Sequence, residues 1–275
     1  MPEGHTIHRI ASQHRSRFVG DAIRVLSPQG RFVDADRLNG RPLVDVQAYG
    51  KHLLYEFDGR RYVHVHLGLF GKVFTGEQPA PAPGPSVRMR LEVENWYSDL
   101  VGPTRCQLID GDQRASLLSR LGPDPLRRGA DPTVAYARLK RSRQPVAALL
   151  MDQTVIAGIG NVYRAEFLYL AKLDPFRAGT NVDPETWKGI WNNAHSFMRA
   201  GVRSGRIITT DPRDREFPGR IVRPSDAHYV YKRTGQWCRR CHTNIASTEL
   251  VGRILYWCPK CQAPLTYAGQ KTKGQ

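Results

Sequence analysis

Long hydrophobic runs are missing from this chain of 275 residues. No apolar stretch approaches the roughly 18 residues that a membrane-spanning helix requires, so we expect no association with a membrane. The first residues are polar or charged where a secretion signal would have an apolar core, which predicts a cytoplasmic protein.

Acidic residues are scarce relative to basic ones. The 41 Lys and Arg residues outnumber the 25 Asp and Glu residues, which gives a formal net charge of +16 at pH 7. Such an excess predicts an anionic partner, with nucleic acid as the first candidate.

Cysteines are few and odd in number. Four of the five form the pairs Cys238-x-x-Cys241 and Cys258-x-x-Cys261, with sixteen residues between the pairs. This spacing argues against a disulfide framework and predicts one zinc ion, held by four thiolates at the base of a β-hairpin. The zinc is expected to be structural, because four thiolates leave no open position for a water molecule. The fifth cysteine, Cys106, is expected in a strand, buried or half-buried.

The hydrophobic pattern predicts an α+β fold with two domains and a zinc finger. Residues 3 to about 16 have the period of a helix, and residues 20 to 117 alternate with period two, which predicts an antiparallel sandwich or barrel. We therefore expect a first domain over residues 1–122, containing an N-terminal helix and a β-sandwich.

The second half has a helical pattern followed by an irregular one. Residues 132–203 predict helices, and residues 204–228 are rich in Arg, Asp, Pro and Gly, which suggests a mobile loop. We expect a helical domain over residues 123–228, a zinc finger over 229–267 and a disordered tail over 268–275.

The N-terminus Met1-Pro2-Glu3-Gly4 carries an unusual candidate for catalysis. Removal of Met1 would leave Pro2 with a secondary amine beside the carboxylate of Glu3. A free amine can attack a carbonyl or acetal carbon and form a cationic iminium. Its ordinary pKa of roughly 7.7–8.0 leaves a share of the amine neutral near pH 7. Alternatively, Pro2 occupies the first position of a helix, where proline is favoured.

Two further positions could contact a nucleic acid in the first domain. Lys51 begins a strand at a turn and is either a functional cation or a surface lysine. Leu69 and Phe70 lie between two glycines, where apolar side chains either wedge into a base stack or are simply buried.

Two more candidates lie in the second half. The segment from Ala157 to Glu166 predicts a glycine-rich turn before a helix with Asn161 as N-cap, whose free N–H groups could hold a phosphate. Without DNA, the same segment would be a tight connection between helices. Arg253 is expected near the tip of the zinc hairpin, as a phosphate contact or as a solvated arginine.

Together these residues resemble the Fpg/Nei family of DNA glycosylases over nearly the whole chain. The resemblance rests on five segments: Pro2-Glu3-Gly4, Lys51, Gly160-Asn161, Tyr231-Lys232-Arg233 and Cys258-Pro259-Lys260-Cys261-Gln262. It implies a helix–two-turn–helix segment in the second domain. It also implies a monomeric, nucleoid-associated bacterial enzyme of base excision repair that acts on damaged DNA.

The resemblance implies a role for each candidate. Pro2 would attack the deoxyribose C1′, Glu3 would act as acid and base, and Lys51 and Arg253 would complete the catalytic group. Base removal would be followed by β,δ-elimination, which nicks the strand. The implied DNA contacts are Asn161, Arg253, Leu69, Phe70, Tyr231 and Arg233.

The branch of the family is suggested by three segments. Residues 99–105 depart from the arginine-containing loop of formamidopyrimidine glycosylases, and Leu69-Phe70-Gly71 is similar to the endonuclease VIII pattern. The opening residues 1–6 resemble actinobacterial endonuclease VIII-like proteins, especially the second mycobacterial paralogue. This favours oxidised pyrimidines as substrates. The alternatives are a formamidopyrimidine or 8-oxoguanine type of glycosylase, and a DNA-binding zinc-ribbon protein without enzymatic activity.

Overall fold

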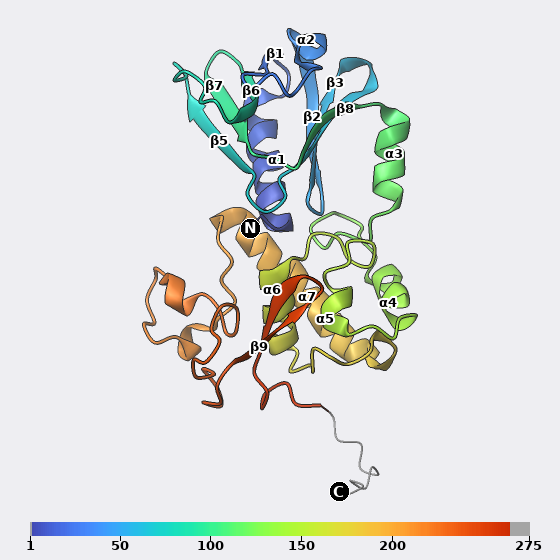
Figure 1. Ribbon diagram of the computed structural model, residues 1–275, viewed down its shortest axis with the longest axis vertical. Coiled ribbons are helices and arrows are strands. Elements are labelled where there is room, and N and C mark those ends of the chain that lie inside the picture. Colours follow the sequence, from blue (N-terminus) through green and yellow to red (C-terminus); the bar gives the residue numbers. More distant parts are fainter. Residues whose placement is uncertain (1, 265–275) are drawn as a thin grey trace, which may run out of the picture.

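The structure is a computed structural model that describes residues 2–264. Most strands occupy one end of the molecule, whereas most helices and one strand hairpin occupy the other. The N-terminal helix runs from the strands toward the helical part (Figure 1). Among the described helices, none has both the length and the apolar character needed to cross a membrane.

Helix α1 (Gly4–Phe18) forms where the sequence predicted a helix, and begins one residue later than expected. Ile7, Ile10 and Phe18 are all buried in the core of the β-rich part. The predicted apolar face is therefore confirmed.

The β-rich part contains eight antiparallel strands in the order β5-β7-β6-β1-β2-β3-β4-β8. Strands β1 and β2 share only two residue pairs, so the sheet folds into two halves at this junction, with the apolar core between them. The predicted sandwich is confirmed, and Cys106 is half-buried in β8 as expected. The strands are β1 (Ala22–Leu26), β2 (Arg41–Tyr49), β3 (His52–Phe57), β4 (Arg61–His66), β5 (Lys72–Glu77), β6 (Val87–Glu92), β7 (Trp96–Val101) and β8 (Arg105–Ile109).

Strand β4 departs from the pattern of one buried and one exposed face. Val63 and Val65 enter the main core, whereas Tyr62 belongs to a smaller cluster with Leu117 on the opposite face. Leu117 lies on α3 (Gly111–Ser119), a helix that the period-two interpretation of residues 20–117 missed.

A capping box explains why the strands end before α3. The Asp110 side chain accepts a hydrogen bond from the Gln113 N–H, and the Gln113 side chain accepts one from the Asp110 N–H. This arrangement satisfies two N–H groups at the start of a helix. It therefore favours a helix here, although the period-two hydrophobic pattern of the preceding residues was expected to continue to residue 117.

The helical part is built around α6 (Asn161–Leu170) and α7 (Pro184–Ser204). Their shared core includes Tyr163, Phe167 and Met198. The helical part also contains α4 (Pro132–Lys140) and α5 (Val146–Leu149), whereas the short helix α2 (Ala35–Leu38) packs on the core of the β-rich part.

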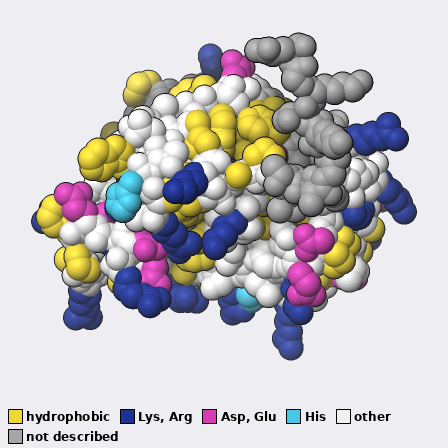
Figure 2. All heavy atoms as spheres, turned by 90° about the horizontal axis from the view of Figure 1, so that it is seen from below, with side chains coloured by type: hydrophobic (Ala, Val, Ile, Leu, Met, Phe, Trp, Pro, Cys, Tyr) yellow, Lys and Arg dark blue, Asp and Glu magenta, His cyan; other side chains and the backbone are white. Residues whose placement is uncertain are grey.

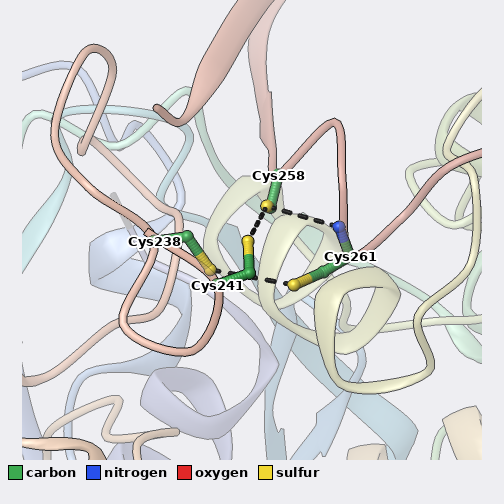
Figure 3. A group of neighbouring side chains, drawn as sticks. All are labelled: Cys238, Cys241, Cys258 and Cys261. Atoms are coloured by element: carbon green, nitrogen blue, oxygen red, sulfur yellow. Dashed lines mark hydrogen bonds between the residues drawn. The ribbon is translucent and has the colours of Figure 1, made fainter. Parts of the chain in front are cut away.

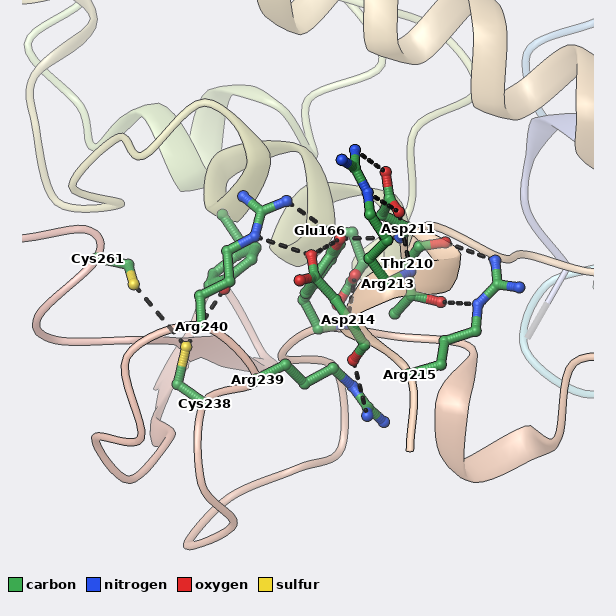
Figure 4. Close-up of polar contacts among 12 residues, drawn as sticks. Glu166, Thr210, Asp211, Arg213, Asp214, Arg215, Cys238, Arg239, Arg240 and Cys261 are labelled. Carbon is green, nitrogen blue, oxygen red and sulfur yellow. Dashed lines mark hydrogen bonds and ion pairs between the residues drawn. The ribbon is translucent and has the colours of Figure 1, made fainter. Parts of the chain in front are cut away.

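The segment 204–228 has little regular structure beyond two short 3₁₀ turns at Pro212–Asp214 and Pro224–Asp226. It is anchored by polar contacts (Figure 4). Buried Asp226 accepts hydrogen bonds from the backbone N–H groups of Glu216 and Phe217 and pairs with Arg239 at 3.0 Å. The mobility expected for this segment stays a prediction.

A two-stranded hairpin, β9 (Ala246–Leu250) and β10 (Arg253–Trp257), completes the described chain. Val251 and Gly252 form its tip, both with positive φ. Seen from the lower end of Figure 1, a cluster of basic side chains lies beside an apolar patch on the surface (Figure 2). Residues 265–267 of the expected finger and the expected tail at 268–275 lie outside the described residues.

Candidate active site at the start of α6

The carboxylate of Glu3 lies at the N-terminus of α6, 157 residues away from Gly160 in the sequence. It accepts hydrogen bonds from the backbone N–H groups of Gly160 at 3.0 Å, Val162 at 2.8 Å and Tyr163 at 3.4 Å. These N–H groups have no partner within the helix, so Glu3 takes the place of a local cap. Because Glu3 is also the N-cap residue of α1, it fixes the starts of both helices relative to each other.

Glycines make this approach possible. A Cβ atom on Gly160 would lie only 2.4 Å from the Glu3 side-chain carbon Cδ. The Gly4 N–H donates to the Gly158 carbonyl at 2.8 Å, and a Cβ atom on Gly4 would lie 2.8 Å from the Gly158 Cα. Any larger residue at these positions would force α1 and α6 apart.

The expectation that Asn161 caps α6 is wrong. Gly160 is the N-cap residue, and the Asn161 side chain instead donates from Nδ2 to the Ile254 carbonyl at 2.9 Å. The N–H groups proposed as a phosphate site are occupied by Glu3. A phosphate contact by Asn161 itself stays a prediction.

Pro2 lies immediately before Glu3 and is half-buried. The helix begins at Gly4, so Pro2 is not at the first helical position and the simpler interpretation of this proline is wrong.

Lys51 lies in the tight turn between β2 and β3, as the sequence predicted. Burial lowers the pKa of Lys51, and the nearby Glu3 carboxylate opposes this shift. Burial likewise raises the pKa of Glu3, although Lys51 and the three N–H donors favour its ionised form. Both groups are thus shifted toward the neutral state, which suits proton transfer near neutral pH.

Arg253 lies at the start of β10, next to the hairpin tip, and is half-buried. It lies close enough to Lys51 and Arg164 for its charge to lower the pKa of each. The structure therefore brings Glu3, Lys51 and Arg253 to one site from distant parts of the chain.

Arg164 was not identified from the sequence. Its side chain is fully buried and has no acidic partner within residues 2–264. The guanidinium donates to the carbonyls of Leu250 at 3.4 Å and Ile254 at 3.2 Å, and to the side-chain oxygen of Asn161. It therefore ties α6 to both strands of the hairpin, directly beside Arg253. Burial lowers the pKa of Arg164 to about 10.

Glu166 is a second buried charge that the sequence analysis missed. Its carboxylate accepts hydrogen bonds from the N–H groups of Tyr229 at 2.8 Å, Val230 at 2.9 Å and Tyr231 at 2.9 Å, and from the Thr209 hydroxyl. It thereby attaches the start of the zinc finger to α6, within the polar group of Figure 4. The sequence feature that could have identified these buried charges is the presence of Arg164 and Glu166 in a mostly apolar helix.

Tyr231 and Arg233 differ in their relation to the site. Tyr231 lies close enough to Glu3 for the carboxylate to raise the pKa of the phenol, although burial is the larger cause. Arg233 instead braces the finger, because it donates to the Tyr229 carbonyl at 2.6 Å and the Trp237 carbonyl at 3.0 Å. The structure does not bring Arg233 into the Glu3 group, and its contact with DNA stays a prediction.

Leu69 and Phe70 lie on the loop between β4 and β5 and are exposed. Leu69 retains 38% of its accessible surface and Phe70 retains 82%. Simple burial is therefore wrong for Phe70, and an apolar side chain so exposed is available for contact with a partner.

The four paired cysteines converge as predicted (Figure 3). All four sulfur atoms lie within 4.8 Å of one another, with Cys238 and Cys261 at 3.8 Å and Cys241 and Cys258 at 3.3 Å. These separations fit a tetrahedral metal with sulfur ligands at ~2.3 Å.

Comparisons with known proteins agree with this geometry. The chain matches the Formamidopyrimidine-DNA glycosylase N-terminal domain over residues 1–114 and the Formamidopyrimidine-DNA glycosylase H2TH domain over residues 121–213. It is 46% identical to Endonuclease 8 1 of Mycobacterium tuberculosis over 95% of this chain and all of that protein. The chain belongs to the Fpg/Nei family of DNA glycosylases.

Solved structures share the fold. The Lactococcus lactis Fpg in complex with DNA containing an abasic site has a TM-score of 0.77 at 22% identity, and the match covers 95% of this chain and all of that one. The MutM (Fpg) protein of Thermus thermophilus has a TM-score of 0.77 at 28% identity, covering 95% of this chain and 98% of that one.

The comparisons exclude one alternative function and also bear on which mycobacterial paralogue the chain resembles. A zinc-ribbon protein that only binds DNA is wrong, because the likeness extends over both the N-terminal and the helical parts. The opening residues suggested the second mycobacterial paralogue, whereas the mycobacterial relative that matches along the chain is named Endonuclease 8 1.

Proposed function

We propose that Pro2 is the nucleophile in the DNA glycosylase and AP lyase reactions of base excision repair that this family performs, and that Glu3 moves the protons. The observation that carries the proposal is the Glu3 carboxylate, buried at the start of α6 beside Pro2 and within reach of the Lys51 charge. With Met1 removed, the Pro2 nitrogen would bond to the deoxyribose C1′ as the bond from C1′ to the base breaks.

Breaking the C1′–O4′ bond of the sugar, with a proton delivered to O4′, would convert this adduct into an open-chain iminium, which acts as an electron sink for the lyase steps. A proton leaves C2′ and the 3′ phosphate departs, and a second elimination releases the 5′ phosphate. Glu3 and Lys51 are suited to these proton transfers, because burial shifts the pKa of each toward neutrality. Hydrolysis of the remaining iminium frees Pro2.

Access to C1′ requires extrusion of the damaged nucleotide, at a cost of a few kcal/mol. The exposed Phe70 and Leu69 are suited to fill the gap, and Arg253 and Asn161 to hold the flanking phosphates. Tyr231 would contact DNA near Glu3.

The proposed substrates are oxidised pyrimidines. Support comes from the 46% identity to an endonuclease 8, against 28% to the Thermus MutM. Cleavage rates on duplexes with one oxidised pyrimidine, 8-oxoguanine or a formamidopyrimidine would decide the branch. Faster excision of either purine lesion would favour the formamidopyrimidine type.

We further propose that Cys238, Cys241, Cys258 and Cys261 hold one structural Zn²⁺. The fit of the four sulfur positions supports this, and the ion would take no part in the chemistry, since four thiolates complete its shell.

Blocking the Pro2 amine tests the mechanism. A short N-terminal extension that cannot be removed should abolish borohydride trapping of an enzyme–DNA adduct and cleavage of abasic DNA, while DNA binding persists. The control carries the same extension after Gln275, and peptide mapping of the wild-type adduct should locate it on Pro2. Normal cleavage by the N-terminally extended protein would make a lysine such as Lys51 the nucleophile and refute the proposal.

A further inference from the structure

A cavity of about 460 Å³ lies next to Lys51, on the outer face of β3, β4 and β8. Three histidines from β3 and β4 line it together with two arginines, one at the start of β8 and one at the end of α3. These five side chains are His52, His64, His66, Arg105 and Arg120.

The charge of this cavity has one sign. No Asp or Glu lines it, and neither Arg105 nor Arg120 forms an ion pair within residues 2–264. Both arginines are exposed at the rim, whereas the hydroxyl groups of Thr104 and Thr154 already donate to the His66 carbonyl and the Asp152 carboxylate. Asp112 lies in the adjoining cavity that shares His64 and Arg105.

The floor of the cavity is a pair of hydrogen-bonded histidines. His52 Nδ1 lies 2.9 Å from His64 Nε2, and His64 is only 2% exposed. One proton must lie between these two nitrogens, so at least one ring is neutral there. The His66 ring lies 5.1 Å from the His52 ring.

A metal ion does not explain the histidines. The four-cysteine cluster is the group of three or more ligand atoms that converges within residues 2–264, and the three histidines do not form such a group. Two guanidinium groups at the rim would also repel a cation.

We propose that this cavity binds one phosphate group of the DNA that is held at Lys51, with Arg105 and Arg120 as the charged contacts and the His52–His64 pair as donors on the floor. The proposal rests on the proposed function, because it requires DNA at the Glu3 site. Guanidinium groups bind phosphate oxygens bidentately, and histidine N–H groups can complete the shell.

Binding should also take up protons. Burial lowers the pKa of His52 to about 4 and that of His64 to about 3, so both are neutral at pH 7 in the free protein. Lys51, Arg105 and Arg120 face His52, and Arg105 also faces His64. His66 faces both rings, and all of these groups favour the neutral form of the pair. A phosphodiester of DNA, with its one negative charge, would oppose this field and raise both pKa values.

The test compares the full-length variants Arg105→Ala/Arg120→Ala and Arg31→Ala on a duplex with an uncleavable abasic-site analogue. Arg31 is an exposed arginine of the same part of the molecule, outside the cavity. The double variant should bind about tenfold more weakly than the control variant, and its log–log salt slope should be shallower by about one, as for one lost phosphate contact. Equal affinity and slope in both variants would overturn the proposal.

Calorimetry in two buffers with different ionisation enthalpies measures proton uptake on DNA binding, and so tests whether the His52–His64 pair takes part. Wild-type protein should take up protons on binding DNA at pH 6.5, and His52→Gln, which keeps a hydrogen-bonding side chain, should take up fewer. Equal uptake would remove the histidine pair from the site.

Two further measurements distinguish this proposal from a site for free phosphate and from a failure of the role proposed for Pro2. Inorganic phosphate that stabilises wild-type protein but not Arg105→Ala/Arg120→Ala, with DNA affinity unchanged, would identify a site for free phosphate and overturn the DNA assignment. Borohydride trapping at saturating enzyme should persist in the double variant. Loss of trapping in wild-type protein would instead refute the function of Pro2.

Discussion

Glu3 combines two roles in one side chain, as a cap for α6 and as the proposed acid–base group. The substitution Glu3→Gln keeps the size of the side chain but places an NH₂ group against backbone N–H donors. We expect the free energy of unfolding to fall by about 1–3 kcal/mol and adduct trapping to disappear. Thermal or urea unfolding measures the first effect, with exposed Glu94→Gln as the control. Wild-type stability of Glu3→Gln would contradict the capping role.

Phe70 differs from Glu3, because we expect it to contribute to activity but little to the stability of the fold. With 82% of its surface exposed, Phe70→Ala should change the free energy of unfolding by less than about 0.5 kcal/mol. Excision from duplex DNA should slow by about tenfold, whereas excision from a single strand, where no stack must be filled, should change less. A uniform loss on both substrates would place Phe70 outside the base stack.

At this scale the sequence indicated candidate residues for the chemistry, whose roles stay predictions, but not how these residues meet. Pro2, Glu3 and Lys51 were recognisable from their local motifs. The contact between Glu3 and α6 was not, because a helix start normally takes its cap from the residue beside it. Arg164 and Glu166 were missed because a charged residue in a helix is usually solvated, and burial becomes visible only when the hairpin and the finger cover them.

At the scale of elements, the decisive connection is between α6 and the hairpin β9–β10. Arg164 supplies it through two hairpin carbonyls and the Asn161 side chain. Arg164→Met keeps the length of the side chain but removes its hydrogen bonds to Leu250, Ile254 and Asn161, which should cost about 1–3 kcal/mol of stability. We also expect weaker binding to abasic DNA, because Arg253 is no longer held at the site.

A double-mutant cycle with Arg253→Ala distinguishes this role from a general loss of stability. If Arg164 acts through Arg253, the double variant should bind DNA no more weakly than Arg253→Ala alone. Exposed Arg141→Met, directly after the end of α4, is the matched control. Additive losses would show that Arg164 stabilises the fold without positioning Arg253.

Element prediction succeeded where the pattern was local. Helix α1 and the antiparallel strands follow from periodicity, and the start of α3 could have been found from the pair Asp110 and Gln113. The two buried faces of β4 could not, because they depend on α3 packing across the sheet, a contact between distant elements.

At the scale of the whole molecule, the four-cysteine cluster and the β-sandwich have separate cores. The core around Cys238 and Cys258 also contains Ala165 and Tyr169 of α6, whereas the sandwich core contains residues from Ile7 to Leu100 and none from the finger. Loss of a metal from the cysteines should therefore disturb the finger and the adjoining face of α6, and leave the sandwich folded.

Removal of the metal tests this division, because binding energy at such a site is also folding energy. Chelation should release about one zinc per chain, increase hydrogen exchange over residues 229–262, and leave residues 53–65 protected. DNA binding should be lost, since the hairpin that carries Arg253 loses its base while Arg164 still holds only its tip. Restored zinc should reverse all three effects, which controls for damage by the chelator. A metal-free protein that retains slow exchange in the hairpin and normal affinity for abasic DNA would show that the protein core alone holds the finger together.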